Sequence, residues 1–253
     1  MVFTVLGRHM TTDLVNKSAQ QFADLKTRLV FFDMDRTILD VSTFHRNNFL
    51  FVLQKMFGVM ELPRAETSGY PYMEVARIYA RAAGIGDGIL DSHETEMETL
   101  FVENMLAILP DELTKYVFPG TVQLLEKLNN EKIPLGLTTG SLRGIAVPLL
   151  KRSGLIKFFP VTSFGDHVNT REQIVELGLE QASWVYGMSV EDFHLVTIGD
   201  APEDIRAGKA FGATTIAVAN GVYNIEQLSV HGPDYLFRDL RDTQAIFNKI
   251  TSN

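Results

Sequence analysis

The chain has 253 residues, of which 45% are hydrophobic and 21% charged. Its net charge of −8 argues against a nucleic-acid or anionic-membrane surface, which would need a basic face. It contains no cysteine, which excludes disulfides, thiolate zinc sites and cysteine nucleophiles. No stretch approaches the roughly 18 apolar residues of a membrane span, so we expect a cytoplasmic protein that starts at Met1 or Met10, in an oligomeric state that the sequence does not indicate.

The first acidic motif follows a buried strand. Apolar residues at helical spacing predict a helix over residues 11–27, and the continuous apolar run 29–32 then predicts a strand buried on both faces. This strand ends at Asp33 and Asp35, whose side chains project to the same side of an extended backbone. Two anions this close repel each other. A hard, oxygen-binding cation such as Mg²⁺ is therefore expected between them, at the strand end where ligands of open α/β sheets bind.

Three helical patterns follow without an intervening strand. They cover residues 43–57, 71–84 and 90–110. Ser42 or Thr43 is a candidate N-cap of the first helix, Gly58 ends it, and Pro71 opens the second. Residues 42–116 are thus predicted to form an all-helical insertion after the first strand.

The polar and aromatic side chains of this insertion have ordinary structural explanations. Its basic residues are each expected at the surface rather than at a ligand, namely His45, Arg46, Arg64, Arg77 and His93. Its aromatic residues are expected in the interior of the insertion rather than in a substrate platform, namely Phe44, Tyr70, Tyr72 and Tyr79.

After the insertion, strands and helices alternate. Strands are predicted over residues 133–137, 158–162, 195–198, 214–218 and, more weakly, 235–237. Helices are predicted over residues 121–128, 142–152 and 172–186, from Pro202 onward, and at the C-terminal end. This alternation implies right-handed crossovers and a parallel sheet with helices on both faces. We therefore predict a Rossmann-like α/β core domain of residues 1–41 and 117–253, with residues 42–116 as a helical cap domain.

Polar groups stand at the ends of three predicted strands and in one loop. The carboxyl ends of parallel strands share one edge of the sheet, so these groups are expected to lie together. They are Asp33, Asp35, Thr139, Gly140, Arg171, Asp200 and Asp204. A set of acids, a hydroxyl, a backbone N–H and a guanidinium suits the handling of a phosphoryl group through a metal ion.

The order of these motifs resembles the haloacid dehalogenase-like hydrolase superfamily, in the branch with a helical cap after the first strand. The resemblance covers roughly residues 28–240. Four segments carry it: Asp33-Met-Asp35-Arg36-Thr37 is similar to Asp-x-Asp-x-Thr, Thr139 to a strand-ending Ser or Thr, Arg171 to a Lys or Arg, and Gly199-Asp200-Ala-Pro-Glu-Asp204 to Gly-Asp-x-x-x-Asp.

The resemblance implies a role for each acid. Asp33 would attack phosphorus and form an aspartyl-phosphate, and Asp35 would protonate the leaving oxygen and then activate water. Mg²⁺ would be held by the Asp33 carboxylate, the Asp35 backbone carbonyl and Asp200. Asp204 would hold metal-bound water or orient Asp200, although an acid there can also serve only to favour a helix N-terminus.

The same resemblance assigns the phosphate contacts. Thr139 and the N–H of Gly140 would bind phosphate oxygens, with Thr138 as an adjacent alternative. Arg171 would bind phosphate and stabilise transition-state charge, the alternative being a solvated position at a helix start. Arg36 stands where Gly is most usual in this branch, and we expect it to influence substrate choice.

We therefore predict Mg²⁺-dependent hydrolysis of a small phosphomonoester, with a phosphorylated metabolite as partner and neither nucleic acid nor membrane. One alternative is a phosphomutase, which has the same motifs but protects its phospho-enzyme from water. Two others are carbon–halogen hydrolysis, against which Asp35 argues, and a non-catalytic binding protein, against which the intact acid set argues. The insertion is expected to open and close over the site.

Overall fold

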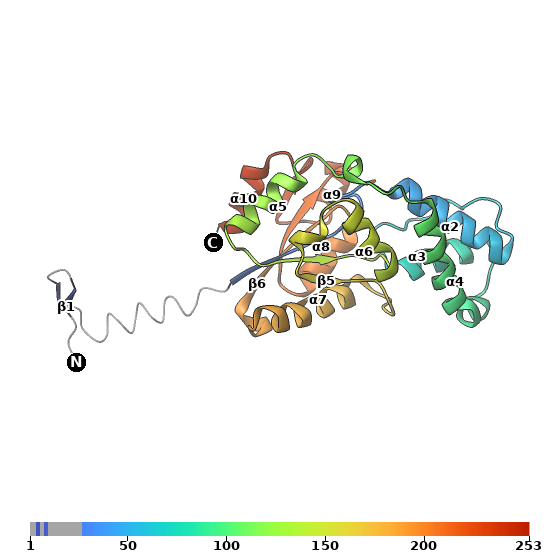
Figure 1. Cartoon of the computed structure of the whole chain (residues 1–253), viewed down its shortest axis with the longest axis horizontal. Coiled ribbons are helices and arrows are strands. Elements are labelled where there is room, and N and C mark those ends of the chain that lie inside the picture. The colour runs from blue at the N-terminus through green and yellow to red at the C-terminus, as the bar shows by residue number, and fades with distance from the viewer. Residues whose placement is uncertain (1–3, 6–7, 10–26, 253) are drawn as a thin grey trace.

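The computed structural model describes residues 4–5, 8–9 and 27–252 (Figure 1). Strands β1 (Thr4–Val5) and β2 (Arg8–His9) pair with each other as a short antiparallel ladder. The helix predicted over residues 11–27 lies outside the described residues, except for Thr27, which belongs to a strand.

A six-stranded parallel sheet forms the centre of the fold. Its strands are β3 (Thr27–Phe32), β4 (Leu135–Thr138), β5 (Val161–Ser163), β6 (Phe193–Gly199), β7 (Thr214–Val218) and β8 (Tyr235–Phe237). The spatial order is β5-β4-β3-β6-β7-β8, and every neighbouring pair is parallel. The predicted α/β parallel sheet is confirmed. β4 and β5 lie on one side of β3, and β6, β7 and β8 lie on the other, so the strand order reverses at β3, as at the switch point where open sheets bind ligands.

Helices cover both faces of this sheet. They are α5 (Thr121–Asn130), α6 (Arg143–Arg152), α7 (Arg171–Tyr186), α8 (Pro202–Ala210), α9 (Ile225–Ser229) and α10 (Thr243–Thr251). Val30 and Phe32 of β3 belong to the apolar cluster that includes residues of α5, α6 and α10. Leu29 and Phe31 belong to the cluster that includes residues of α7 and α8. The alternation of side chains along one strand therefore fills both layers of the core.

Two predicted strands are displaced in the structure. The strand predicted over residues 133–137 begins only at Leu135, just after Pro134. The strand predicted over residues 158–162 is instead Val161–Ser163, because Ile156–Phe158 forms a 3₁₀ turn. The aromatic side chains of this turn are buried in the core rather than along a strand. The short helix α9 was not predicted.

The insertion after β3 is helical, as predicted. It consists of α2 (Ser42–Phe57), α3 (Tyr72–Ala82), α4 (Asp87–Ile108) and a 3₁₀ turn at Thr114–Tyr116. Gly58 ends α2 in the left-handed conformation, at φ 72°. Neither predicted N-cap is correct, since Val41 holds that position and the Asp40 carboxylate accepts from the backbone N–H of Ser42 at 3.2 Å.

Aromatic rings hold the insertion together. Phe49 stacks on Tyr72 with ring centroids 4.4 Å apart, and Phe101 meets both rings edge-on. Tyr72 is buried in the interior of the insertion, as predicted, but Tyr70, Tyr72 and Tyr79 also line a cavity between the insertion and the sheet. Figure 1 shows the three helices packed beside the α/β part of the chain. No helix in the described part of the chain has both the length and the apolar character to cross a membrane.

Candidate active site

The predicted site residues meet at the carboxyl end of the sheet. Three adjacent strands deliver them: Asp33 follows β3, Thr139 follows β4, and Asp200 follows β6. Between this edge and the insertion lies a cavity of about 260 Å³. The predicted residues that line it are Asp33, Asp35, Thr139, Gly140, Arg171 and Asp200, and the insertion contributes side chains of α2 and α3.

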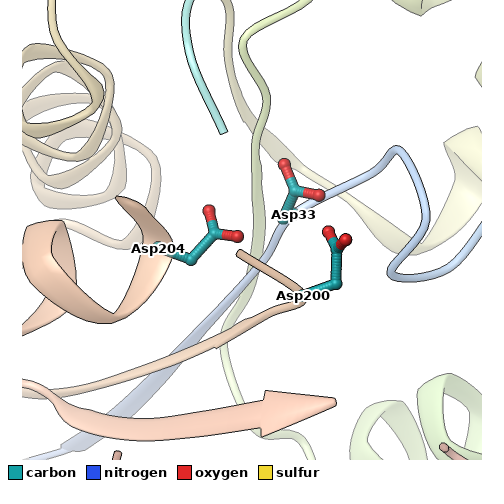
Figure 2. Close-up of side chains that lie close together, drawn as sticks. All are labelled: Asp33, Asp200 and Asp204. Atoms are coloured by element: carbon teal, nitrogen blue, oxygen red, sulfur yellow. The ribbon is translucent and has the colours of Figure 1, made fainter. Parts of the chain in front are cut away.

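Three buried carboxylates lie together at this edge of the sheet; Asp33 and Asp200 line the cavity and Asp204 does not. Figure 2 shows Asp33, Asp200 and Asp204 with their carboxylates gathered together, and one oxygen of each lies within 4.8 Å of the others. All three residues are buried. Nη2 of Arg171 lies 2.5 Å from Oδ1 of Asp33 and 2.8 Å from Oδ1 of Asp204. It also donates to the carbonyl of Thr138 at 2.8 Å.

The arginine is held in place by the start of its helix. Arg171 is the first residue of α7, one residue earlier than predicted, and only 3% of it is exposed. Thr170 precedes it as N-cap, and Thr170 and Gln173 satisfy each other's backbone N–H groups in a capping box. The alternative of a solvated arginine is therefore wrong.

The described residues supply too few hydrogen-bond donors to satisfy every oxygen of these carboxylates. Thr37 donates its Oγ1 hydrogen toward Asp33 at 3.1 Å and toward Asp200 at 3.3 Å. Oδ2 of Asp200 is buried and has no hydrogen-bond partner among the described residues. Gly221 lies so close that a Cβ there would stand 1.7 Å from this oxygen. An acceptor without a donor, in a group of three acids, fits a bound divalent cation.

The pKa values of these acids reflect their burial and their closeness to one another. Burial, together with the charges of Asp204 and Asp35, raises the pKa of Asp33 to about 7 in spite of the Arg171 charge. Burial and the charges of Asp33 and Asp204 raise the pKa of Asp200 well above its ordinary value. Three anions cannot all remain ionised here beside one arginine, so the site favours either protons or a cation.

Asp35 has a different environment from the other acids. Its Oδ1 lies 2.9 Å from Nε2 of His45, and its Oδ2 accepts from the Ser141 hydroxyl at 3.0 Å. Burial alone would raise the pKa of Asp35. The His45 charge and the hydrogen bonds from His45 and Ser141, with help from the Arg36 charge, lower it below its ordinary value. The Asp35 carboxylate does not belong to the three-carboxylate group.

The loop after β4 brings backbone groups to the cavity. Thr139 lines the cavity, and its hydroxyl accepts from the N–H of Ser141 at 3.1 Å. The alternative residue, Thr138, is not among the residues that line the cavity. Its Cγ2 would stand 3.2 Å from a Cβ placed on Gly178 of α7. At Gly140 a Cβ would stand 2.4 Å from the carbonyl oxygen of Tyr70, so only glycine allows this approach of the insertion.

Comparison with known proteins decides the family. Residues 30–218 match the family model described as haloacid dehalogenase-like hydrolase. The chain belongs to the haloacid dehalogenase-like hydrolase family. The predicted resemblance is thereby confirmed.

Relatives of this haloacid dehalogenase-like hydrolase include phosphatases. A pyrophosphatase, PpaX, of Oceanobacillus iheyensis is 23% identical over 228 residues, which is 88% of this chain and 97% of the relative. A probable phosphatase, IndB, of Dickeya dadantii is 26% identical over 210 residues, or 82% of this chain and 88% of the relative. A crystal structure of β-phosphoglucomutase from Clostridium difficile superposes with a TM-score of 0.71 at 15% identity, covering 88% of this chain and 97% of that one, and shows the shared fold.

Two side chains of the hydrolase site were not predicted from the sequence. His45 was expected at the surface, but its side chain is 12% exposed and contacts Asp35. Ser141 was not among the predicted site residues, yet its hydroxyl donates to Asp35. Its position two residues after Thr139 was the available signal, because alternate residues of an extended segment face the same side. For His45 the sequence offers no comparable signal.

Three further arginines, two of the insertion and one in the loop after β3, differ in whether they line the cavity. Arg77 forms ion pairs with Asp91 and Glu94, each at 2.7 Å, on the surface of the insertion. Arg46 is exposed, as predicted, but it also lines the cavity. Arg36 lines the cavity as well, from a backbone with φ 61°.

Proposed function

We propose that this haloacid dehalogenase-like hydrolase is a Mg²⁺-dependent phosphatase that cleaves small phosphomonoesters. The observation that carries the proposal is the group of three buried carboxylates, one oxygen of which lacks a donor, at the base of a cavity that also contains Asp35. The relatives named as phosphatases support the same chemistry.

Asp33 is the proposed nucleophile. Its carboxylate lines the cavity at the end of the central strand, and Arg171 and Thr37 each hold one of its oxygens. Attack on phosphorus forms an aspartyl-phosphate and expels the alcohol of the substrate. Because Arg171 is itself pinned by Thr138 and Asp204, it orients Asp33 as well as offsetting charge at the phosphate.

Asp35 is the proposed acid and base. It delivers a proton to the leaving oxygen in the first step and removes one from water in the second. His45 and Ser141 fix one carboxylate oxygen each, so the group keeps one orientation through both steps.

Mg²⁺ is the proposed cofactor, held by the carboxylates of Asp33 and Asp200 and the backbone carbonyl of Asp35. When bound, it offsets the repulsion between the nucleophile and the phosphate. Asp204, which pairs with Arg171 and accepts from the N–H of Ala201 at 3.1 Å, orients the loop that carries Asp200. Thr139 and the N–H of Gly140 bind phosphate oxygens.

Residues 42–116 are the proposed cap domain, and the rest of the chain is the core domain. The N–H of Tyr72 donates to the carbonyl of Gly140 at 2.7 Å, so the insertion touches the phosphate-binding loop directly. His45 brings a second contact, to Asp35. Closure of the cap over the cavity would exclude bulk water from the attack on phosphorus.

Release of inorganic phosphate from an aryl phosphate with added Mg²⁺ tests this function. We expect turnover by the native chain, none after Asp33→Asn, and normal turnover after Asp111→Asn, a matched change at an exposed acid. Absence of phosphate release by the native chain contradicts the proposal. Incubation with a sugar phosphate and a bisphosphate primer separates the phosphomutase alternative, because a mutase yields an isomer in place of inorganic phosphate. Halide release without Mg²⁺ separates the dehalogenase alternative.

A further inference from the structure

Two arginines line the cavity without a side-chain hydrogen bond or ion pair to another described residue, although the charge of Arg36 acts on Asp35 and Asp200. Among the basic side chains that line it, Arg171 is paired with carboxylates and His45 with Asp35. Arg36 and Arg46 line the same cavity, yet neither guanidinium forms a hydrogen bond or an ion pair with another described residue. A guanidinium presents a rigid fork of donors that matches carboxylate and phosphate oxygens.

Arg36 occupies a backbone position that does not favour a side chain. Its φ of 61° lies in the left-handed region, which glycine adopts freely and L-residues adopt at an energetic cost. It stands directly after Asp35 and is partly buried. Retention of a long cationic side chain in this conformation is readily explained by a contact with a ligand in the cavity.

Arg46 approaches the cavity from another element. It belongs to α2 of the insertion, next to His45 in the sequence, and is exposed. Ser42 and Thr43 of the same helix also line the cavity, and the Ser42 hydroxyl donates to the Asp40 carboxylate at 2.7 Å. The two guanidiniums thus reach the cavity from different elements, whereas the proposed nucleophile and metal ligands follow strands of the sheet.

The proposed reaction already accounts for one anion in the cavity. The transferred phosphoryl group must lie against Asp33, where Thr139, Gly140 and Arg171 are its proposed contacts. Arg36 and Arg46 add two guanidiniums to the same cavity, which exceeds what an uncharged alcohol would need. The volume of about 260 Å³ limits the ligand to a small molecule.

We propose that the leaving group of the substrate carries a second anionic group, a carboxylate or a phosphate, which is bound by Arg36 and Arg46. This inference rests on the proposed phosphatase function. It names the substrate class as small phosphomonoesters with two separated negative charges.

Three substrates of equal chain length test the inference. They are propyl phosphate, 3-phosphooxypropanoate with a terminal carboxylate, and 1,3-propanediol bisphosphate with a terminal phosphate. With Mg²⁺ present, we expect kcat/KM to be at least about tenfold higher for one of the two charged substrates than for propyl phosphate. The bisphosphate has two cleavable ends, so a kcat/KM only twofold above that of propyl phosphate is expected on statistical grounds and does not indicate a second anion site. The charged substrate that is preferred identifies the second group.

For each arginine substitution, the quantity compared is the ratio of kcat/KM for the preferred charged substrate to kcat/KM for propyl phosphate. We expect this preference to fall about tenfold or more in Arg36→Gln and in Arg46→Gln, mainly through KM, and to be largely kept in Arg36→Lys. Arg36→Lys has the same backbone strain as Arg36→Gln, so only the charge differs between them. Arg64→Gln is the matched control, because Arg64 is an exposed arginine of the insertion that does not line the cavity.

The outcomes distinguish this inference from the proposed function. Hydrolysis of all three substrates with equal kcat/KM overturns the inference and leaves the phosphatase function intact. An equal loss on all three substrates in Arg36→Gln also overturns it, because Arg36 would then bind the transferred phosphate. Failure to hydrolyse any of them, or an aryl phosphate, overturns the function and the inference together.

Discussion

Nε2 of His45 lies 2.9 Å from Oδ1 of Asp35, which joins a helix of the insertion to the end of the central strand. Tyr72 supports this histidine, with ring centroids 5.5 Å apart and its hydroxyl 3.5 Å from Nδ1. Asn48 in turn donates to the same hydroxyl at 3.1 Å. The orientation of the proposed acid and base therefore depends on side chains of the insertion.

This contact predicts that His45→Gln impairs proton transfer to the leaving group. An alkyl leaving group needs that proton, whereas a nitrophenolate leaves readily without it. We therefore expect kcat to fall about tenfold or more for an alkyl phosphate and only a few-fold for 4-nitrophenyl phosphate. The measurement is kcat for both substrates in both proteins, with His231→Gln, at an exposed histidine, as control. Equal losses on both substrates would show that His45 acts only on the fold.

The sequence located the acids of the site because topology fixes where strand ends lie. Asp33, Thr139 and Asp200 each follow a strand of a parallel sheet, so their convergence required only the correct order of elements. The hydrophobic pattern supplied that order, and the structure changed the bounds of the elements and added the short helix α9. The exception at residues 158–162 arose because buried aromatic residues of a turn have the same pattern as a short strand.

The sequence could not locate the contacts that depend on how the insertion packs. His45 lies on the first turn of α2, and nothing in its spacing indicates that this turn faces the end of β3. The same is true of Arg46, whose exposure was predicted but whose place at the cavity was not. The positions of His45 and Arg46 depend on how the insertion packs against the sheet. The close contact between Tyr70 and Gly140 is part of that packing and joins segments that are distant in the sequence.

The crowded carboxylates predict an unusual dependence of stability on pH. The folded-state pKa values of Asp33, Asp200 and Asp204 are raised above the ordinary value of 3.8, mainly by burial, and that of Asp33 reaches about 7. Between these values the folded state binds more protons than the unfolded state. The free energy of unfolding without metal should therefore fall as the pH rises from about 4 to about 7.

Urea unfolding at several pH values, with EDTA or with Mg²⁺, measures this effect. Mg²⁺ replaces the protons, so we expect it to reduce or abolish the fall and to stabilise the protein more at pH 7 than at pH 5. Asp200→Asn removes one of the three acids and should weaken both the fall and the effect of Mg²⁺. Identical curves with EDTA and with Mg²⁺ would refute a metal site at these residues.

The buried ion pairs predict a large cost for removing their cation. In Arg171→Met, the carboxylates of Asp33 and Asp204 lose their partner, and the carbonyl of Thr138 loses its donor. We expect the free energy of unfolding to fall by about 3–5 kcal/mol near pH 7. The loss should be smaller near pH 5, because the same acids can then take up protons. Chemical denaturation at the two pH values measures it.

Arg171→Lys is the control for this loss. It keeps the positive charge but lacks the fork that reaches two carboxylates and a carbonyl together. We expect a stability between those of the native chain and Arg171→Met, with reduced phosphatase activity. A Met variant as stable as the native chain at pH 7 would mean that the acids there are not charged.

The contact between Gly221 and Asp200 predicts a loss of metal affinity without a loss of charge. A Cβ at residue 221 would stand 1.7 Å from Oδ2 of Asp200, so Gly221→Ala must displace the carboxylate that lacks a donor. We expect the Mg²⁺ concentration for half-maximal activity to rise about tenfold or more. Gly88→Ala is the matched control, because nothing lies within 4 Å of a Cβ there. An unchanged Mg²⁺ requirement in Gly221→Ala, with Asp33→Asn still inactive, would place the metal away from Asp200.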